Sequence, residues 1–116
     1  MKVLVCGDRN WTNKEAIRRE LSKLPTDTVV IEGEARGADT LGRIVAEEIG
    51  FEFEAYPADW EQYGRAAGPI RNKEMLTEGK PDLVLAFHEN IEKSKGTKNM
   101  IKIAQKAGID TRLIEK

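Results

Sequence analysis

Glycine occurs together with arginine or lysine in three short stretches of the sequence, residues 33–39 (GEARGAD), 64–72 (GRAAGPIRN) and 94–97 (SKGT). Glycine allows the main chain to approach a ligand closely, because no Cβ stands in the way. A helix N-terminus directs unpaired N–H groups and a positive dipole end at an anion, and arginine binds phosphate in a bidentate manner. The three stretches therefore predict a phosphate site, with Arg36 and Arg71 as its leading side chains.

Carboxylates near these stretches are the candidates for catalysis. Asp8, Glu34 and Asp39 supply groups that act as general acids, bases or nucleophiles in the cleavage of an N-glycosidic bond. His88, the only histidine, ends a predicted strand at the expected ligand crevice, but the sequence offers it no evident partner. One cysteine and one histidine cannot form a typical zinc shell, so we expect no metal site. Neither a dinucleotide fingerprint nor a P-loop motif is present, and no cofactor is identified.

Three aromatic side chains fall in predicted loops or at helix starts. Trp60 and Tyr63 are suited to stacking on a nucleotide base, and equally to covering the edge of the core. Trp11 fits either a hydrophobic contact at a helix start or a wall of the ligand site. The sequence leaves these alternatives open.

Length and composition describe one ordinary globular domain. The chain has 116 residues, of which 40% are apolar and 34% charged, and this is enough to bury one core without disulfides or metals. We therefore expect a single domain over residues 1–116. The net charge of −1 provides no overall field for nucleic acid or an anionic membrane, so we expect neither as a partner.

The single cysteine, Cys6, lies in the first apolar run and has no second cysteine to pair with. This predicts a buried, inert thiol and fits a reducing cytoplasm. No apolar stretch reaches the length of a membrane span, and the apolar run at the N-terminus is too short for a signal peptide. We therefore expect a cytoplasmic protein.

The chain alternates apolar strands with amphipathic helices. Thr12 and Glu15 have the form of a capping box for the first helix, and Pro69 takes the first position of the third. Residues 57–67 are predicted to form a long loop. We predict strands at 2–6, 28–31, 51–56, 83–87 and 111–114, and helices at 13–24, 41–49, 69–79 and 97–107.

This alternation predicts an α/β fold, a three-layer Rossmann-like sandwich with a five-stranded, mainly parallel sheet. The first, second and fourth strands are the most apolar, which favours the order 3-2-1-4-5 with the third strand at an edge. Ligands of open parallel sheets bind beyond the carboxyl ends of the strands, where chain order reverses. The loops there are residues 7–11 and 88–97, with residues 33–39 as their neighbour.

The same stretches resemble a known family. The run from Gly33 to Asp39, the block of residues 64–72 with Met75-Leu76, and Ser94-x-Gly96-Thr97 with Met100 are similar to the YspA-like branch of the SLOG superfamily. That superfamily includes the Lonely Guy (LOG) phosphoribohydrolases and the DprA/Smf DNA-processing proteins. The resemblance covers almost the whole chain. It implies a Rossmann-like domain that binds nucleotides or nucleotide-derived ligands.

The resemblance is closer for binding than for hydrolysis. In the LOG enzymes a P-G-G-x-G-T-x-x-E motif supplies phosphate-binding amides and a catalytic glutamate. Ser94-Lys95-Gly96-Thr97 fits the phosphate-binding part, but Met100 stands at the glutamate position. The Arg-Lys pair of those enzymes is Arg71-Asn72 here. A thioether cannot donate a proton. With Met100 at this position, the chain therefore lacks the catalytic glutamate that the LOG enzymes use.

Three functions are compatible with these observations. The first is the binding or sensing of a phosphorylated nucleotide, such as a nucleoside monophosphate or an ADP-ribose-like molecule. The second is hydrolysis of a nucleotide N-glycosidic bond, and the third is the binding of single-stranded DNA, which the net charge disfavours. Relatives in the superfamily often pair, which makes a homo-oligomer an open expectation. The predicted ligand-binding residues are Gly7, Arg9, Gly33, Arg36, Gly37, Asp39, Trp60, Arg65, Arg71, Asn72, Ser94, Gly96 and Thr97.

Overall fold

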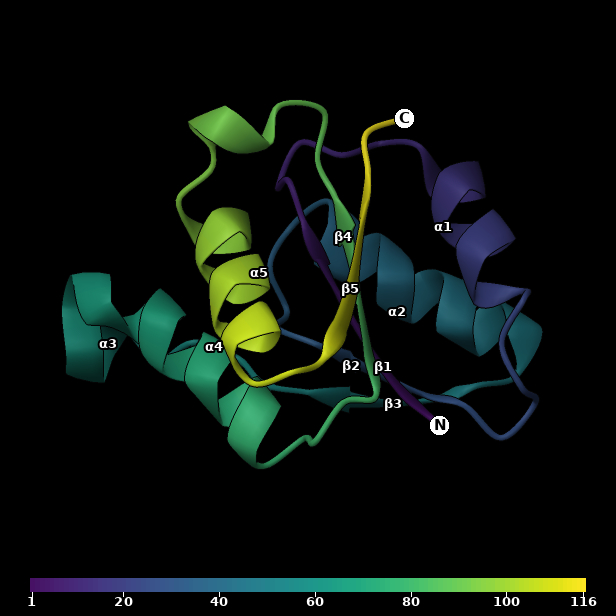
Figure 1. Cartoon of the computed structure of the whole chain (residues 1–116), viewed down its shortest axis with the longest axis horizontal. Helices are drawn as coiled ribbons and strands as arrows, with labels where there is room; N and C mark the ends of the chain where they lie inside the picture. The colour runs from purple at the N-terminus through teal and green to yellow at the C-terminus, as the bar shows by residue number, and fades with distance from the viewer.

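The computed structural model describes residues 1–116 and is built around a single sheet (Figure 1). Five parallel strands follow one another in the order β3-β2-β1-β4-β5. This confirms the predicted Rossmann-like α/β fold and its strand order. The strands are β1 (Lys2–Gly7), β2 (Val29–Glu32), β3 (Glu52–Ala55), β4 (Leu83–Phe87) and β5 (Asp110–Ile114).

Helices cover both faces of the sheet. They are α1 (Lys14–Leu21), α2 (Ala38–Ile49), α3 (Trp60–Tyr63), α4 (Ala67–Thr77) and α5 (Gly96–Lys106), with 3₁₀ turns η1 (Gly64–Ala66) and η2 (Ile91–Lys93). In Figure 1, α1 and α2 lie on one side of the sheet, α4 and α5 lie on the other, and the short α3 projects beyond α4. None of these helices has the length and apolar character needed to cross a membrane.

Alternate residues of β1 build two separate cores, because successive side chains of a strand point to opposite faces. Val3 and Val5 pack with residues of α1 and α2, whereas Leu4 and Cys6 pack with residues of α4 and α5. β1 and β4 lie inside the sheet and are covered on both faces. Phe53 of β3 is 40% exposed, as expected for the predicted edge strand.

The parallel arrangement brings the loops that follow the strands to one edge of the sheet, and those after β1 and β4 lie at the top of Figure 1. β1 and β4 are neighbours, and Gly7 pairs with Phe87 in their register. The next residues, Asp8 and His88, therefore leave the sheet side by side. The N–H group of Asp8 donates to the carbonyl of Phe87 over 2.9 Å, which continues the pairing by one residue.

The prediction of one long loop over residues 57–67 is wrong. Asp59 caps the short helix α3, because its Oδ1 accepts a hydrogen bond from the N–H of Gln62 over 3.1 Å. α4 then begins at Ala67, which places Pro69 at the third helical position rather than the first. Proline is tolerated there because the first turn of a helix does not use its N–H groups.

The predicted capping box of the first helix is also wrong. α1 begins at Lys14 with Asn13 as its N-cap, and the Oδ1 of Asn13 accepts from the N–H of Ala16 over 3.1 Å. Asparagine is at least as good an N-cap as threonine. The cap therefore lies one residue later than the Thr12–Glu15 pattern indicates.

Replacement of Asn13 by alanine is expected to lower the free energy of unfolding by about 1 kcal/mol, because the N–H of Ala16 loses its acceptor. Thr12→Ala is the matched control, and its effect should stay below about 0.5 kcal/mol, as for surface positions without such a contact. Urea denaturation of the two variants beside the wild type measures both values. Equal losses in the two variants would return the capping role to Thr12.

Candidate ligand-binding cleft

Two hollows lie side by side at the carboxyl edge of the sheet. The first, here named the acidic lobe, has a volume of about 390 Å³ and is lined by Asp8, Asp39 and His88 among others. The second, named the aromatic lobe, has a volume of about 560 Å³ and is lined by Trp60 and Arg65 among others. Both volumes suit a small-molecule ligand, for which pockets of roughly 300–1,000 Å³ are usual. The residues common to both lobes, named the junction, are Arg9, Ala35, Arg71, Asn72, Lys95 and Gly96.

The first three amides of the loop after β2 are not free to bind a ligand. The N–H groups of Gly33 and Ala35 donate to Oδ2 of Asp39 over 3.1 and 3.3 Å. The N–H group between them, that of Glu34, donates to Oε2 of Glu32 over 2.6 Å. Three successive amides are therefore satisfied by the protein's own carboxylates.

The glycines of this loop make room for the protein itself. A Cβ at Gly33 would lie 2.4 Å from Nη1 of Arg71. Gly37 has a φ of 72°, and a Cβ there would lie 2.2 Å from the carbonyl oxygen of Asp8. Gly37 needs glycine because of its backbone conformation and its close contact with the main chain of Asp8, whereas a Cβ at Gly33 would displace the side-chain end of Arg71 from α4. Contacts within the protein therefore account for both glycines, and the expected role in admitting a ligand is not required to explain them.

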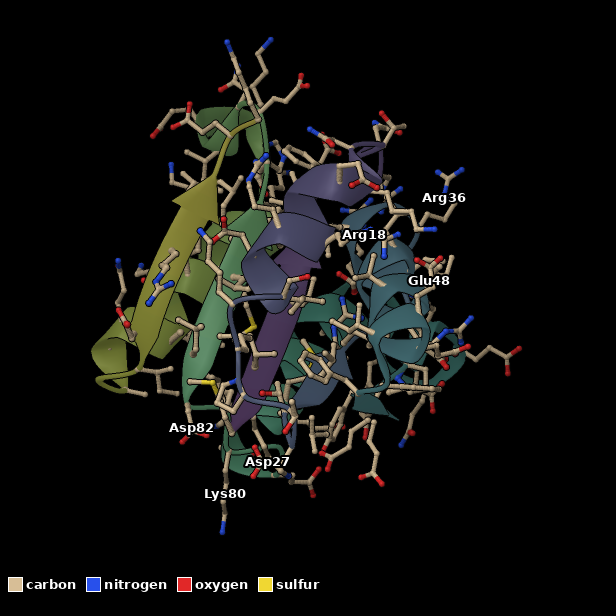
Figure 2. The ribbon with its side chains drawn as sticks, turned by 90° about the vertical axis from the view of Figure 1, so that its right-hand side faces the viewer. Arg18, Asp27, Arg36, Glu48, Lys80 and Asp82 are labelled. Atoms are coloured by element: carbon tan, nitrogen blue, oxygen red, sulfur yellow. The ribbon has the colours of Figure 1, made fainter.

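Arg36 is exposed and lines neither lobe. In Figure 2 its side chain projects away from the body of the protein, on the side covered by α1 and α2. Gly37 also lies outside both lobes. The structure therefore does not bring these two predicted residues to the cleft.

Arg71 is the central cation of the junction. Its Nη1 donates to the carbonyl of Gly33 over 2.6 Å, and its Nε donates to Oδ1 of Asn72 over 3.1 Å. A guanidinium group has five N–H donors, so three remain after these two contacts. Because Arg71 lines both lobes, these donors are available to a ligand at the junction.

Asn72 holds the start of α5 in place. Its side chain is buried, and its Nδ2 donates to the carbonyl of Gly96 over 3.3 Å and to Oδ1 of Asn99 over 3.0 Å. With Oδ1 accepting from Arg71, the amide is fully used within the protein. Asn72 therefore orients the helix start and the arginine.

Part of the α5 N-terminus is free. Oγ of Ser94 accepts from the N–H groups of Thr97 and Lys98 over 3.0 and 3.4 Å, so these amides are already paired. The N–H groups of Lys95 and Gly96 have no acceptor in the protein. The side chain of Lys95 is exposed and makes no ion pair within the protein. Two amides and one ammonium group therefore face the junction together.

The acidic lobe has an apolar floor of Cys6, Met75 and Met100, which are all buried. Asp39 beside it is only 5% exposed, and burial raises its pKa to about 6 although Arg71 acts in the opposite direction. Burial also raises the pKa of the Cys6 thiol far above its usual range. Cys6 is thus a buried thiol, as the sequence predicts, and it is not poised as a nucleophile.

The aromatic residues separate into two groups. Trp11 is 5% exposed, packs against Phe87 with ring centroids 5.7 Å apart, and donates from Nε1 to the carbonyl of Asn13. It therefore belongs to the core. Trp60 is 57% exposed and forms a wall of the aromatic lobe, whereas Tyr63, at 42% exposure, lines neither lobe.

The structure thus brings together most of the predicted ligand-binding residues. Lys95 and His88 also line the cleft, and sequence reasoning gave them little weight. Lys95 stands between small residues in the 94–97 stretch, which was the available signal for it. The predicted residues that line at least one lobe are Gly7, Arg9, Gly33, Asp39, Trp60, Arg65, Arg71, Asn72, Ser94, Gly96 and Thr97, and the catalytic candidates Asp8 and Glu34 line one lobe each.

Fold and sequence together define the class of this protein. Residues 1–63 match the family described as YAcAr: YspA, cpYpsA-related SLOG family, and the chain belongs to that family. It is 39% identical over 117 residues to the Gene 61 protein of Mycobacterium phage D29, an alignment that covers 93% of this chain and 91% of the phage protein. It also resembles the X-ray structure of DNA processing protein A (DprA) from Streptococcus pneumoniae, with a TM-score of 0.77 and 18% identity. That likeness covers 97% of this chain and 49% of the DprA chain, and it shows a shared fold.

The buried carboxylate of Glu32 should make stability depend on pH. Glu32 is 1% exposed, its Oε1 has no hydrogen-bond partner, and burial raises its pKa from 4.5 to about 7. The folded protein therefore retains a proton that the unfolded chain releases between these values. This contribution to stability is complete below about pH 4.5 and is lost as the pH rises through 7.

Glu32→Gln removes the titrating group and retains an oxygen for the N–H of Glu34. We expect the free energy of unfolding of the wild type, minus that of the variant, to fall by roughly 3 kcal/mol between pH 4.5 and pH 8. Urea denaturation at several pH values measures this difference, in which the other titrating groups cancel. Parallel curves for the two proteins would contradict the expected titration of Glu32.

Proposed function

We propose that the cleft binds a phosphorylated nucleotide or a nucleotide-derived ligand, with phosphate at the junction. The observation that carries this proposal is the convergence of unpaired donors there. Arg71 retains three N–H groups, Lys95 supplies a free ammonium, and the N–H groups of Lys95 and Gly96 lack protein acceptors. Charged and main-chain donors of this kind form the short, strong hydrogen bonds typical of phosphate sites.

The dipole of α5 acts in the same direction. The 11-residue helix begins at Gly96, so its positive end lies at the junction, where it favours an anion. The overall charge of the chain is −1, and long-range attraction is therefore weak. Recognition of phosphate at this site depends on local geometry.

The neighbouring aromatic lobe is suited to a nucleobase. The indole of Trp60 is exposed on the wall of this hollow, and a base stacked on an aromatic ring gains about 1–3 kcal/mol. The resemblance to SLOG proteins implies nucleotide-derived ligands and supports the same interpretation. Phosphate donors beside an aromatic wall thus favour a nucleotide over a simple phosphate ester.

Lys95→Ala is expected to weaken the binding of ADP by about 5–10-fold, which corresponds to roughly 1 kcal/mol for one exposed charge-assisted contact. Isothermal titration calorimetry with ADP measures the change. Lys93→Ala is the matched control, because Lys93 is exposed, lies two residues away in η2 and lines neither lobe. Equal effects of the two substitutions would contradict a role for Lys95, and no heat from the wild type at millimolar ADP would contradict the proposed function.

One observation favours N-glycosidic hydrolysis as a second candidate. Asp39 is a buried carboxyl whose pKa is about 6, and its Oδ2 is fixed by two main-chain N–H groups. A carboxyl with a raised pKa is suited to donate a proton to a leaving base near neutral pH. In this role Asp39 would replace the catalytic glutamate of the LOG enzymes, whose position is taken by Met100 in this chain.

If Asp39 acts as a general acid, Asp39→Asn should reduce the release of free base from AMP by at least about 10²-fold. The wild-type rate should fall as the pH rises above 6, because the acid form of Asp39 is then lost. Chromatography of the reaction mixture measures the released base. Glu89→Gln is the control, since Glu89 is exposed and lines neither lobe, and a wild type that releases no base would dismiss hydrolysis of AMP.

A further inference from the structure

The charged side chains of the acidic lobe and of the junction differ in sign. Asp8 and Asp39 line the acidic lobe only, whereas the cations Arg9, Arg71 and Lys95 line the junction. Beyond the junction, the aromatic lobe is walled by Trp60, by proline and glycine residues, and by one carboxylate and one cation, Glu34 and Arg65. A ligand that fills the cleft therefore meets two carboxylates in the acidic lobe, three cations at the junction, and an aromatic side chain with one charge of each sign in the aromatic lobe.

His88 and Asp8 form a pair inside the acidic lobe. Nε2 of His88 lies 3.9 Å from Oδ2 of Asp8, and the two side chains are only 12% and 27% exposed. Nδ1 of His88 accepts a hydrogen bond from the N–H of Asn90 over 3.0 Å. The neutral ring therefore carries its proton on Nε2, so a donor N–H and an acceptor carboxylate stand next to each other.

Asp39 adds a second acceptor to this lobe. Its side chain is 5% exposed, and Oδ2 is held by the loop after β2. No group of the protein donates to Oδ1, although Asp39 lines the lobe. This oxygen is not one of the fully buried atoms without a partner, so it is open to a donor from the ligand or from solvent.

This set of groups selects for an uncharged, polyhydroxylated fragment. A phosphate in the acidic lobe would meet the carboxylates of Asp8 and Asp39, and like charges at close range repel. Sugar hydroxyls donate to carboxylates and also accept from the N–H of His88. The lobe therefore matches a ribose better than an anion.

We propose, on the basis of the proposed function, that the acidic lobe binds the terminal sugar of a nucleoside diphosphate sugar. Its two phosphates lie at the junction and its base lies against Trp60. The order of groups in the cleft requires phosphate in the middle of the ligand. A nucleoside monophosphate has its phosphate at one end, and with the base on Trp60 it leaves the acidic lobe unfilled.

Calorimetry with ADP-ribose and ADP tests this assignment, because the two ligands differ by the terminal ribose. Asp8→Asn and His88→Gln should each weaken ADP-ribose by about tenfold relative to ADP. Glu89→Gln should leave the ratio of the two affinities unchanged, since Glu89 is the exposed neighbour of His88 and lines neither lobe. Retained binding of ADP shows that each variant is folded.

Trp60→Leu tests the position of the base. It should weaken the binding of ADP and of ADP-ribose equally, by about tenfold. Tyr63→Leu is the control and should change neither affinity. A loss confined to ADP-ribose in Trp60→Leu would place the sugar in the aromatic lobe and overturn the orientation. Equal losses of both ligands in Asp8→Asn and His88→Gln would overturn the sugar site while leaving nucleotide binding intact. Absence of binding of both ligands to the wild type would contradict the proposed function itself.

Discussion

The contact between Arg71 and Gly33 holds the cleft together. It joins the loop after β2 to α4, with Nη1 of Arg71 donating to the Gly33 carbonyl over 2.6 Å. The first three amides of the same loop are bound by the carboxylates of Asp39 and Glu32. The arginine also offsets part of the burial cost of Asp39, since its charge lowers the pKa that burial raises. The remaining guanidinium donors are thereby fixed in direction at the junction.

The glycine-rich sequence after β2 predicts an anion site, and the loop does bind anions. These anions are the protein's own carboxylates, those of Asp39 and Glu32. Glycine and successive free amides suit a carboxylate side chain as well as a phosphate, because both present oxygen acceptors. The motif alone therefore cannot separate internal from external anions. At α5 the outcome differs, because Ser94 pairs with the amides of Thr97 and Lys98 and leaves those of Lys95 and Gly96 free. Whether an amide stays free depends on which side chain accepts a hydrogen bond from it, and residue types alone do not determine this.

More of the fold than of the site could be predicted from the sequence. Two-sided burial of β1 and β4 and the exposed Phe53 on β3 follow from apolar patterning, and so does the strand order. Helix starts were less predictable, because Asn13 has in Thr12 a neighbour of similar capping ability and because the helix that Asp59 caps has only four residues. At the site, adjacency of strands brings His88 beside Asp8, a contact across 80 positions of the chain that spacing cannot indicate. Arg36 was misplaced because residue types do not indicate the direction of a loop side chain, which here points away from the cleft.

Met100 packs in the core and also forms part of the apolar floor of the acidic lobe. It is 1% exposed and lies with Cys6 and Met75 beneath the acidic lobe, where the three form part of the core between the sheet and α4 and α5. A glutamate there would bring another negative charge into the apolar floor beside Asp39, and repulsion together with desolvation would oppose its ionisation. The thioether instead keeps the floor apolar, and burial in this environment is the main reason why the pKa of Asp39 reaches about 6. Apart from Lys95 at the junction, the groups of the acidic lobe suited to proton transfer are Asp8 and His88 from the loops after β1 and β4 and Asp39 from the first turn of α2.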